Sequence, residues 1–304
     1  MTEAQDSGET PPERENGGAW PRVARLAGGL YFVSTPIGAA RDITLRGLDI
    51  LATADVLAAE DTRTLRHLCD IHGVALAGRP LLAYHEHNGP AQRPVILRAL
   101  AEGRSVAYAS EAGTPLVADP GFQLARAAIT AGHAVLAAPG PSAVLAALTV
   151  SGLPSDRFLF AGFPPSSKGA RRSWLAELAP VPATLVFYES PRRIREMLID
   201  VSETFGGERQ AAVCRELTKR FEEVRRGTLA ELAASFAGQT VKGEIVVLVD
   251  RAAERIVDPQ EVEDALRDRL ARMRLKEAVA EVAAAFDQPR REVYQLALQL
   301  EGKA

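Results

Sequence analysis

The pattern of hydrophobic and polar residues changes sharply after about residue 27. Residues 1–27 are rich in Gly, Pro, Glu and Arg, which is typical of a disordered tail. Beyond them, short apolar stretches alternate with amphipathic ones. The apolar stretches predict strands at 30–34, 55–59, 81–84, 105–109 and 134–137, and the amphipathic ones helices at 42–54, 62–72, 93–102, 122–131 and 142–149. This alternation indicates a mostly parallel sheet covered by helices on both faces.

The second half of the chain follows a different pattern, and a Ser-Gly-Leu-Pro segment at 151–154 separates the two halves. Here the expected strands lie at 157–160, 183–188, 211–215, 222–227 and 244–249, with helices at 192–205 and 228–237. From residue 259 the pattern is purely helical. The sequence therefore predicts a tail at 1–27, α/β domains at 28–150 and 151–250, and a small helical appendage at 251–304.

Composition narrows the classes of protein that remain open. The net charge of -3 means that a nucleic-acid partner must be held by a local basic patch. The two cysteines, Cys69 and Cys214, form neither a metal-ligand spacing nor a disulfide framework, so we expect no metal and a reducing, cytoplasmic setting. The nearly uncharged run at 134–153 contains the Pro-Gly-Pro turn at 139–141, which favours strand, turn and helix over a membrane span.

Three loops rich in small residues follow strands of the first domain, at 35–38, 111–115 and 139–143. In a parallel sheet, ligands bind beyond the carboxyl ends of the strands, so these loops predict a pocket lined by backbone N–H and C=O groups. Such a pocket suits a neutral or zwitterionic cofactor with an adenine and a ribose. The chain contains no G-x-G-x-x-G, P-loop or G-x-S-x-G motif, which disfavours dinucleotide, nucleotide-hydrolase and α/β-hydrolase chemistry.

Longer motifs then follow one another along the chain. They include LYFVSTPIGAARDI at 30–43, SEAGTPLVADPG at 110–121, PGPSA at 139–143, SGLPSDRFLFAG at 151–162, FYESPRR at 187–193, CRELTKRF at 214–221 and KGEIVV at 242–247. In this order they resemble the ribosomal small-subunit methyltransferase I family of the tetrapyrrole-methylase superfamily. The resemblance covers residues 30 to about 249, with a helix-turn-helix-like tail beyond it. Glu111 departs from the family pattern, in which Asp is more frequent at this position.

The resemblance implies two α/β domains with a cofactor cleft between them, a homodimer, and S-adenosylmethionine as cofactor. The implied acceptor is the ribose 2′-hydroxyl of a cytidine in the decoding region of 16S rRNA, within the 30S subunit, with no membrane involved. The cofactor is expected to touch Pro36, Ile37, Gly38, Gly113, Thr114, Pro115, Pro139, Ser142, Ala143, Tyr188 and Gly243.

Methyl transfer from a sulfonium requires alignment of oxygen, methyl and sulfur, and removal of the hydroxyl proton. Two segments on loops after strands, 60–61 and 85–87, offer a carboxylate or an imidazole that could accept this proton. The catalytic candidates are Asp61, His85, His87 and Glu111, with Glu60 beside Asp61 in the first segment. Other roles stay open: the histidines suit a hydrogen-bonded surface loop or a phosphate contact, and Asp61 suits a helix N-terminus paired with Arg63. A zinc site at the histidines lacks a third ligand.

Cations for RNA contact follow strands of the second domain. These are Lys168, Arg171, Arg172, Arg192, Arg193, Arg195, Lys219 and Arg220. Arginines of the C-terminal helices are interleaved with acidic residues, so phosphate contact and packing are both open there. Two rivals remain: a methylase of corrin precursors on the same fold, and a non-catalytic ribosome-assembly factor, which the intact cofactor loops disfavour.

Overall fold

A computed structural model describes residues 25–252, 258–286 and 288–302 of the chain. Most of the tail predicted at 1–27 lies outside the described residues. The internal contacts divide the chain into two units, residues 1–252 and 253–304.

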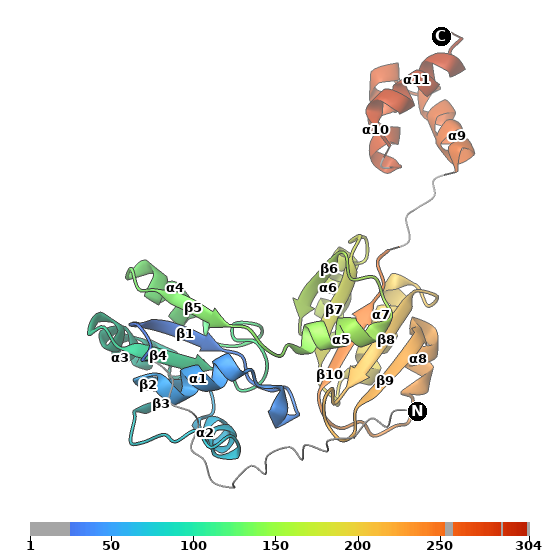
Figure 1. Ribbon diagram of the computed structural model, residues 1–304. Coiled ribbons are helices and arrows are strands. Elements are labelled where there is room, and N and C mark those ends of the chain that lie inside the picture. Colours follow the sequence, from blue (N-terminus) through green and yellow to red (C-terminus); the bar gives the residue numbers. More distant parts are fainter. Residues whose placement is uncertain (1–24, 253–257, 287, 303–304) are drawn as a thin grey trace, which may run out of the picture. The chain divides into compact units, whose positions relative to one another are not determined.

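The larger unit begins with a five-stranded parallel sheet (Figure 1). Its strands are β1 (Gly29–Val33), β2 (Val56–Ala59), β3 (Leu81–Ala83), β4 (Ser105–Ala109) and β5 (Val135–Ala138). Their order is β3-β2-β4-β1-β5, and every pairing is parallel. The expected parallel sheet is confirmed, and its order places β3 at one edge.

Helices cover both faces of this sheet because its strands are apolar on both sides. The helices are η1 (Ala40–Asp42), α1 (Leu45–Thr53), α2 (Thr62–Ile71), α3 (Gly89–Ala101) and α4 (Phe122–Thr130). Alternate residues of β1 point to opposite faces: Tyr31 and Val33 pack with α1 and α2, and Leu30 and Phe32 pack with α3 and α4. Two separate cores therefore hold the sheet between its helices.

A second five-stranded sheet follows and is mixed. Its strands are β6 (Phe158–Gly162), β7 (Thr184–Glu189), β8 (Gln210–Arg215), β9 (Glu223–Thr228) and β10 (Ile245–Val249). In the order β6-β7-β10-β8-β9, only β6 and β7 run parallel. One face packs on α6 (Lys168–Leu178), α7 (Ile194–Phe205) and α8 (Leu229–Ser235).

The other face of this sheet packs on α5 (Ala143–Ser151), the helix that reaches the expected boundary between residues 150 and 151. Val144, Ala147 and Leu148 of α5 share a core with Val186 and Leu248 of the second sheet. The sequence does not show this, because α5 is apolar nearly all round and so has no single face that indicates its partner.

Helix α6 was not among the helices predicted from the sequence. Its apolar positions, Trp174, Leu175 and Leu178, have helical spacing, and Arg171 lies one turn earlier on the same face. The basic residues at its start were instead expected to contact RNA. Position 171 is therefore on the packed face of a helix.

The smaller unit contains α9 (Pro259–Leu270), α10 (Leu275–Ala285) and α11 (Arg290–Leu300), which share their own core. Val262, Leu266, Val279, Val282 and Val293 are buried in it. The predicted C-terminal helices are confirmed. No helix in the described ranges is long and apolar enough to cross a membrane.

Candidate active site

The three turns at the carboxyl edge of the first sheet are hydrogen-bonded to one another. The backbone N–H of Thr35 donates to the Gly113 carbonyl (3.0 Å), and the Gly113 N–H donates back to Thr35 (2.9 Å). The Thr114 hydroxyl donates to the Pro141 carbonyl at 2.9 Å. Gly113 has a φ of +78°, which an L side chain rarely adopts. These contacts fix turns that are far apart in sequence.

A cavity of about 700 Å³ opens beside these turns, a size within the range of about 300–1,000 Å³ typical of small-molecule sites. Strand ends of the second sheet close its other side. The expected cofactor residues that line it are Pro36, Ile37, Gly38, Gly113, Thr114, Ser142, Ala143, Tyr188 and Gly243. Pro115 and Pro139 belong to the same turns but are not among the lining residues. The site gathers these residues as the sequence predicted, and their binding role stays a prediction.

The loop between β8 and β9 brings the second sheet against the first turn. The Thr218 hydroxyl accepts the N–H of Ala39 at 3.0 Å. A Cβ on Gly38 would lie 2.5 Å from Lys219 Cγ and 2.6 Å from Thr218 Oγ1, so only glycine fits there. Thr218 itself has a φ of +65°, which is strained for a β-branched residue. The loop between β8 and β9 therefore lies directly against the first turn beside the cavity.

The cavity is strongly acidic. Its carboxylates are those of Glu60, Glu111, Asp119, Glu189 and Glu244, and Lys219 is the lone cation among the described lining residues. The Lys219 ammonium donates to Glu216 Oε1 (2.9 Å) and Glu244 Oε2 (2.7 Å). Burial opposes its charge, but these two carboxylates outweigh burial and raise the pKa of Lys219. The interior therefore favours a ligand with positive charge.

Three of the expected catalytic residues do not line the cavity. Asp61 caps α2: its carboxylate accepts the N–H of Arg63 (2.8 Å) and pairs with the Arg63 guanidinium (2.7 Å). These hydrogen bonds lower the pKa of Asp61 to about 2, which makes it a weak proton acceptor. The structural alternative for Asp61 is therefore the one that the geometry supports.

His85 and His87 follow β3, the edge strand, and are not among the residues that line the cavity. The backbone N–H of His85 donates to the Asn88 side chain at 2.8 Å, and the two imidazole centroids are 6.1 Å apart. The described residues contain no group of three metal-ligating side chains. Of the expected catalytic residues, Glu111 alone lines the cavity.

Glu60 lines the cavity where Asp61 does not, because neighbouring residues after a strand point in opposite directions. Burial raises the pKa of Glu60, and the nearby carboxylates of Asp119, Glu111 and Glu86 raise it further. A carboxylate with a raised pKa is the better proton acceptor. Its position directly after β2 was the available sequence signal.

Asp119 was not among the site residues expected from the sequence, and it holds the loop after β4. Its carboxylate accepts the Tyr108 hydroxyl (3.0 Å) and the N–H groups of Gly121 (2.7 Å) and Leu116 (3.2 Å). Leu116 and Ala118 both have positive φ, at 72° and 55°. A loop with such strained residues needs these bonds to persist.

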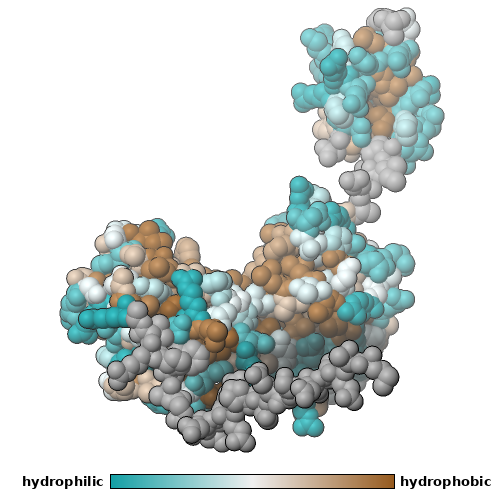
Figure 2. Space-filling model, in the orientation of Figure 1, coloured by the Kyte–Doolittle hydropathy of each residue, from teal (hydrophilic) through white to brown (hydrophobic). Residues whose placement is uncertain are grey.

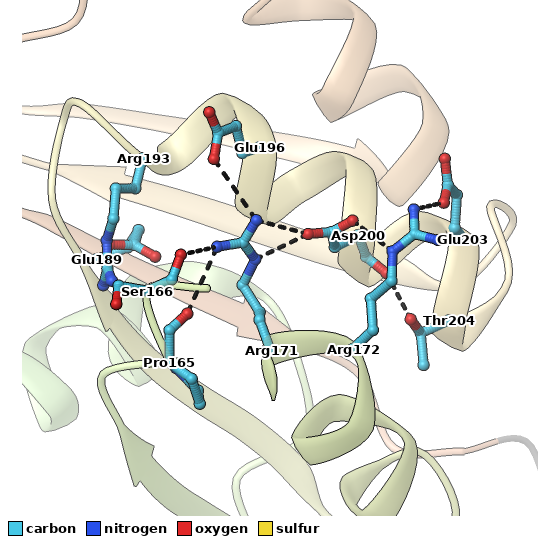
Figure 3. A network of polar contacts seen from close by, with 10 residues as sticks. All are labelled: Pro165, Ser166, Arg171, Arg172, Glu189, Arg193, Glu196, Asp200, Glu203 and Thr204. Carbon is cyan, nitrogen blue, oxygen red and sulfur yellow. Dashed lines mark hydrogen bonds and ion pairs between the residues drawn. The ribbon is translucent and has the colours of Figure 1, made fainter. Parts of the chain in front are cut away.

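The cations expected to contact RNA have different environments. Lys168 and Arg192 are exposed, while Arg193 pairs with Glu189 at 2.7 Å and Arg172 pairs with Asp200 at 2.8 Å. The expectation for Arg171 is wrong, because its side chain is 1% exposed and pairs with Asp200 inside the domain (Figure 3). Helical spacing places it on the packed face of α6.

Residues 29–233 match the family model of tetrapyrrole (corrin/porphyrin) methylases, and residues 257–301 match the RsmI C-terminal HTH domain. The ribosomal RNA small subunit methyltransferase I of Mesorhizobium japonicum is 50% identical over 272 residues, 89% of this chain and 92% of that protein.

The chain belongs to the ribosomal RNA small subunit methyltransferase I family. The member from Mycobacterium tuberculosis is 44% identical over 274 residues, covering 90% of this chain and 95% of its own length. The resemblance seen in the sequence motifs is thereby confirmed.

Solved structures show the same fold. A cobalt precorrin-4 methyltransferase superposes with a TM-score of 0.56 at 18% identity, over 73% of this chain and 94% of that enzyme. The expected tetrapyrrole-methylase fold with a C-terminal helical part is therefore confirmed.

Proposed function

We propose that this family member transfers a methyl group from S-adenosylmethionine to the ribose 2′-hydroxyl of a cytidine in the decoding region of 16S rRNA. The observation that carries the proposal is the acidic cavity between three fixed turns and the second sheet, in a chain whose relatives are named as small-subunit rRNA methyltransferases.

The lining residues fit S-adenosylmethionine in charge and in shape. The cofactor carries a sulfonium and an ammonium against one carboxylate, and the cavity presents five carboxylates against the single ammonium of Lys219. The turns at Pro36–Gly38, Gly113–Thr114 and Ser142–Ala143 would hold it, with backbone groups available to the adenine and ribose. When bound, it supplies a methyl group attached to a positively charged sulfur.

The chain's own residues have two tasks in the reaction, to orient the acceptor hydroxyl and to receive its proton. We assign the second task to Glu60 rather than Asp61, His85 or His87, since it lines the cavity and its pKa is raised. The proton would pass from the 2′-hydroxyl to a Glu60 carboxylate oxygen. Glu111, which follows the neighbouring strand β4, is another of the five carboxylates that line the cavity.

The acceptor is proposed to reach the cavity from a rim that carries the exposed cations Lys168 and Arg192. Phosphates suit this rim and are repelled by the acidic interior, so a single ribose would enter while the RNA backbone stays outside. We place the reaction in the cytoplasm, on the 30S subunit.

A homodimer is also proposed. Leu145 of α5 is 55% exposed and Phe158 of β6 is 42% exposed, on a domain whose surface shows large hydrophobic areas (Figure 2). Strand β6 is at the edge of its sheet. Light scattering on the purified wild type and on Leu145→Asp tests this proposal. A dimer that buries Leu145 would dissociate in the variant, whereas a monomeric wild type would refute the proposal.

The direct test is transfer of labelled methyl from S-adenosylmethionine to 30S subunits that lack the modification, followed by mass mapping of nucleosides. Label in 2′-O-methylcytidine is the expected result, with Glu60→Gln slower in kcat and His85→Ala close to wild type. Label in another nucleoside would correct the acceptor. Label in tetrapyrrole intermediates but not in RNA would refute the proposal.

A further inference from the structure

Phe163 is a large apolar side chain left open at the cavity. It is 56% exposed although it is one of the lining residues. Its ring meets Tyr188 edge to face with centroids 5.5 Å apart, and Tyr188 meets Phe160 in the same way at 4.8 Å. The three rings form a row from the second sheet to the solvent, and Phe163 is its accessible end.

The loop that carries Phe163 is held in place by hydrogen bonds from the buried guanidinium of Arg171. Arg171 donates from Nη1 to the carbonyl of Ser166 (3.1 Å) and, less closely, to that of Pro165 (3.4 Å), and from Nε to Asp200 Oδ2 (2.8 Å) (Figure 3). Burying a guanidinium is unfavourable unless every donor finds a partner. Here Arg171 links two carbonyls of the loop to Asp200 on α7, so the loop that carries the Phe163 ring is already positioned in the absence of a ligand.

The surroundings of Phe163 suit a planar base with a phosphate backbone. Lys168, exposed, begins the helix directly after this loop, and Arg192, also exposed, follows the lining residues Ser190 and Pro191. The cavity interior is acidic and disfavours phosphate. Proteins recognise unpaired nucleotides by stacking bases on aromatic rings while nearby cations hold the backbone.

We propose that Phe163 is the platform on which a nucleobase of the RNA substrate stacks. The stack holds the target nucleotide at the mouth, with its ribose directed into the cavity. This inference rests on the proposed function, because it assigns one contact of that RNA substrate.

The test is Phe163→Ala, compared with Phe163→Trp, Phe163→Leu and the matched control Phe122→Ala. Phe122, on α4, is 54% exposed and does not line the cavity. Losing one base–aromatic stack is expected to raise the KM for 30S subunits by about 5- to 150-fold. The Trp variant keeps the wild-type KM, and the Leu variant behaves like Ala. The Kd for S-adenosylmethionine and the Tm stay at wild-type values in all four.

Three results would overturn the inference. An unchanged KM for 30S subunits in Phe163→Ala shows that the ring makes no energetically significant contact with the RNA. Full recovery in Phe163→Leu shows an apolar contact rather than stacking. A weaker Kd for S-adenosylmethionine with an unchanged KM for 30S places the cofactor's adenine on the ring instead.

Failure of the proposed function is distinguishable from failure of this inference. If the wild type transfers no methyl group to 30S subunits, anisotropy of a labelled single-stranded oligoribonucleotide still measures binding. Weaker binding by Phe163→Ala than by Phe122→Ala would support the stack, and equal binding would refute it.

Discussion

The buried pair between Arg171 and Asp200 offers the sharpest test of this structure. The two side chains are 1% and 2% exposed, and the Arg171 Nη2 nitrogen lies 2.7 Å from Asp200 Oδ2. Asp200→Asn removes the negative charge and leaves the guanidinium buried. Breaking such a pair from one side costs about 3–5 kcal/mol, which for a unit of this size lowers Tm by roughly 6–20 °C.

The matched control is Arg172→Met. Arg172 contacts the same carboxylate at 2.8 Å, but its side chain is 39% exposed. Solvent screens such a contact, so its loss is expected to cost about 0–1 kcal/mol. The contrast between the two variants therefore depends on burial rather than on distance.

Urea unfolding followed by tryptophan fluorescence measures the free energy of unfolding of both variants. Trp174 lies on α6, one turn from Arg171, and a Trp20→Phe background removes the other tryptophan. The reasoning fails if Asp200→Asn costs no more than Arg172→Met.

The dependence on pH gives a second check of the same pair. Burial acts to raise the pKa of Asp200, but hydrogen bonds from Arg172 and Arg171 outweigh it and hold the pKa below its usual value. The stabilisation is therefore present above the unfolded pKa of about 3.9 and is lost as the pH falls through the folded value. The difference between wild type and Asp200→Asn should shrink only in strong acid.

Three further outcomes are expected. Glu60→Gln should stabilise the fold at neutral pH. The raised pKa of Glu60 favours its protonated form in the folded state, so the contribution of Glu60 to the free energy of unfolding is lost as the pH rises. Thermal melts in which the Tm difference between Glu60→Gln and wild type is no larger at pH 8 than at pH 4 contradict this. Burial raises the pKa of both Cys69 and Cys214 to about 11, so a thiol reagent at pH 8 should label them only in denaturant; rapid labelling of the native protein would show that they are accessible. Gly38→Ala should weaken binding of S-adenosylmethionine by about 1–3 kcal/mol, since its Cβ would meet Lys219; calorimetry with an unchanged Kd would exclude that contact.

The sequence by itself determined the strands, the helices other than α6, and the edge of the first sheet at which the site lies. Periodicity located every strand of both sheets to within two residues, and the small-residue turns after β1, β4 and β5 marked the cavity. These features are local: alternation, turn chemistry and the rule that ligands bind beyond parallel strand ends require no knowledge of distant contacts.

Tertiary structure alone decided which polar side chains meet. Asp61 and Glu60 are adjacent in sequence, yet one caps a helix and the other lines the cavity. Arg171 belongs to a basic run but is buried against Asp200, 29 positions away along the chain. Which charge is buried, and beside which partner, depends on how helices pack side by side on one face of the sheet, and that information is spread over residues distant in sequence.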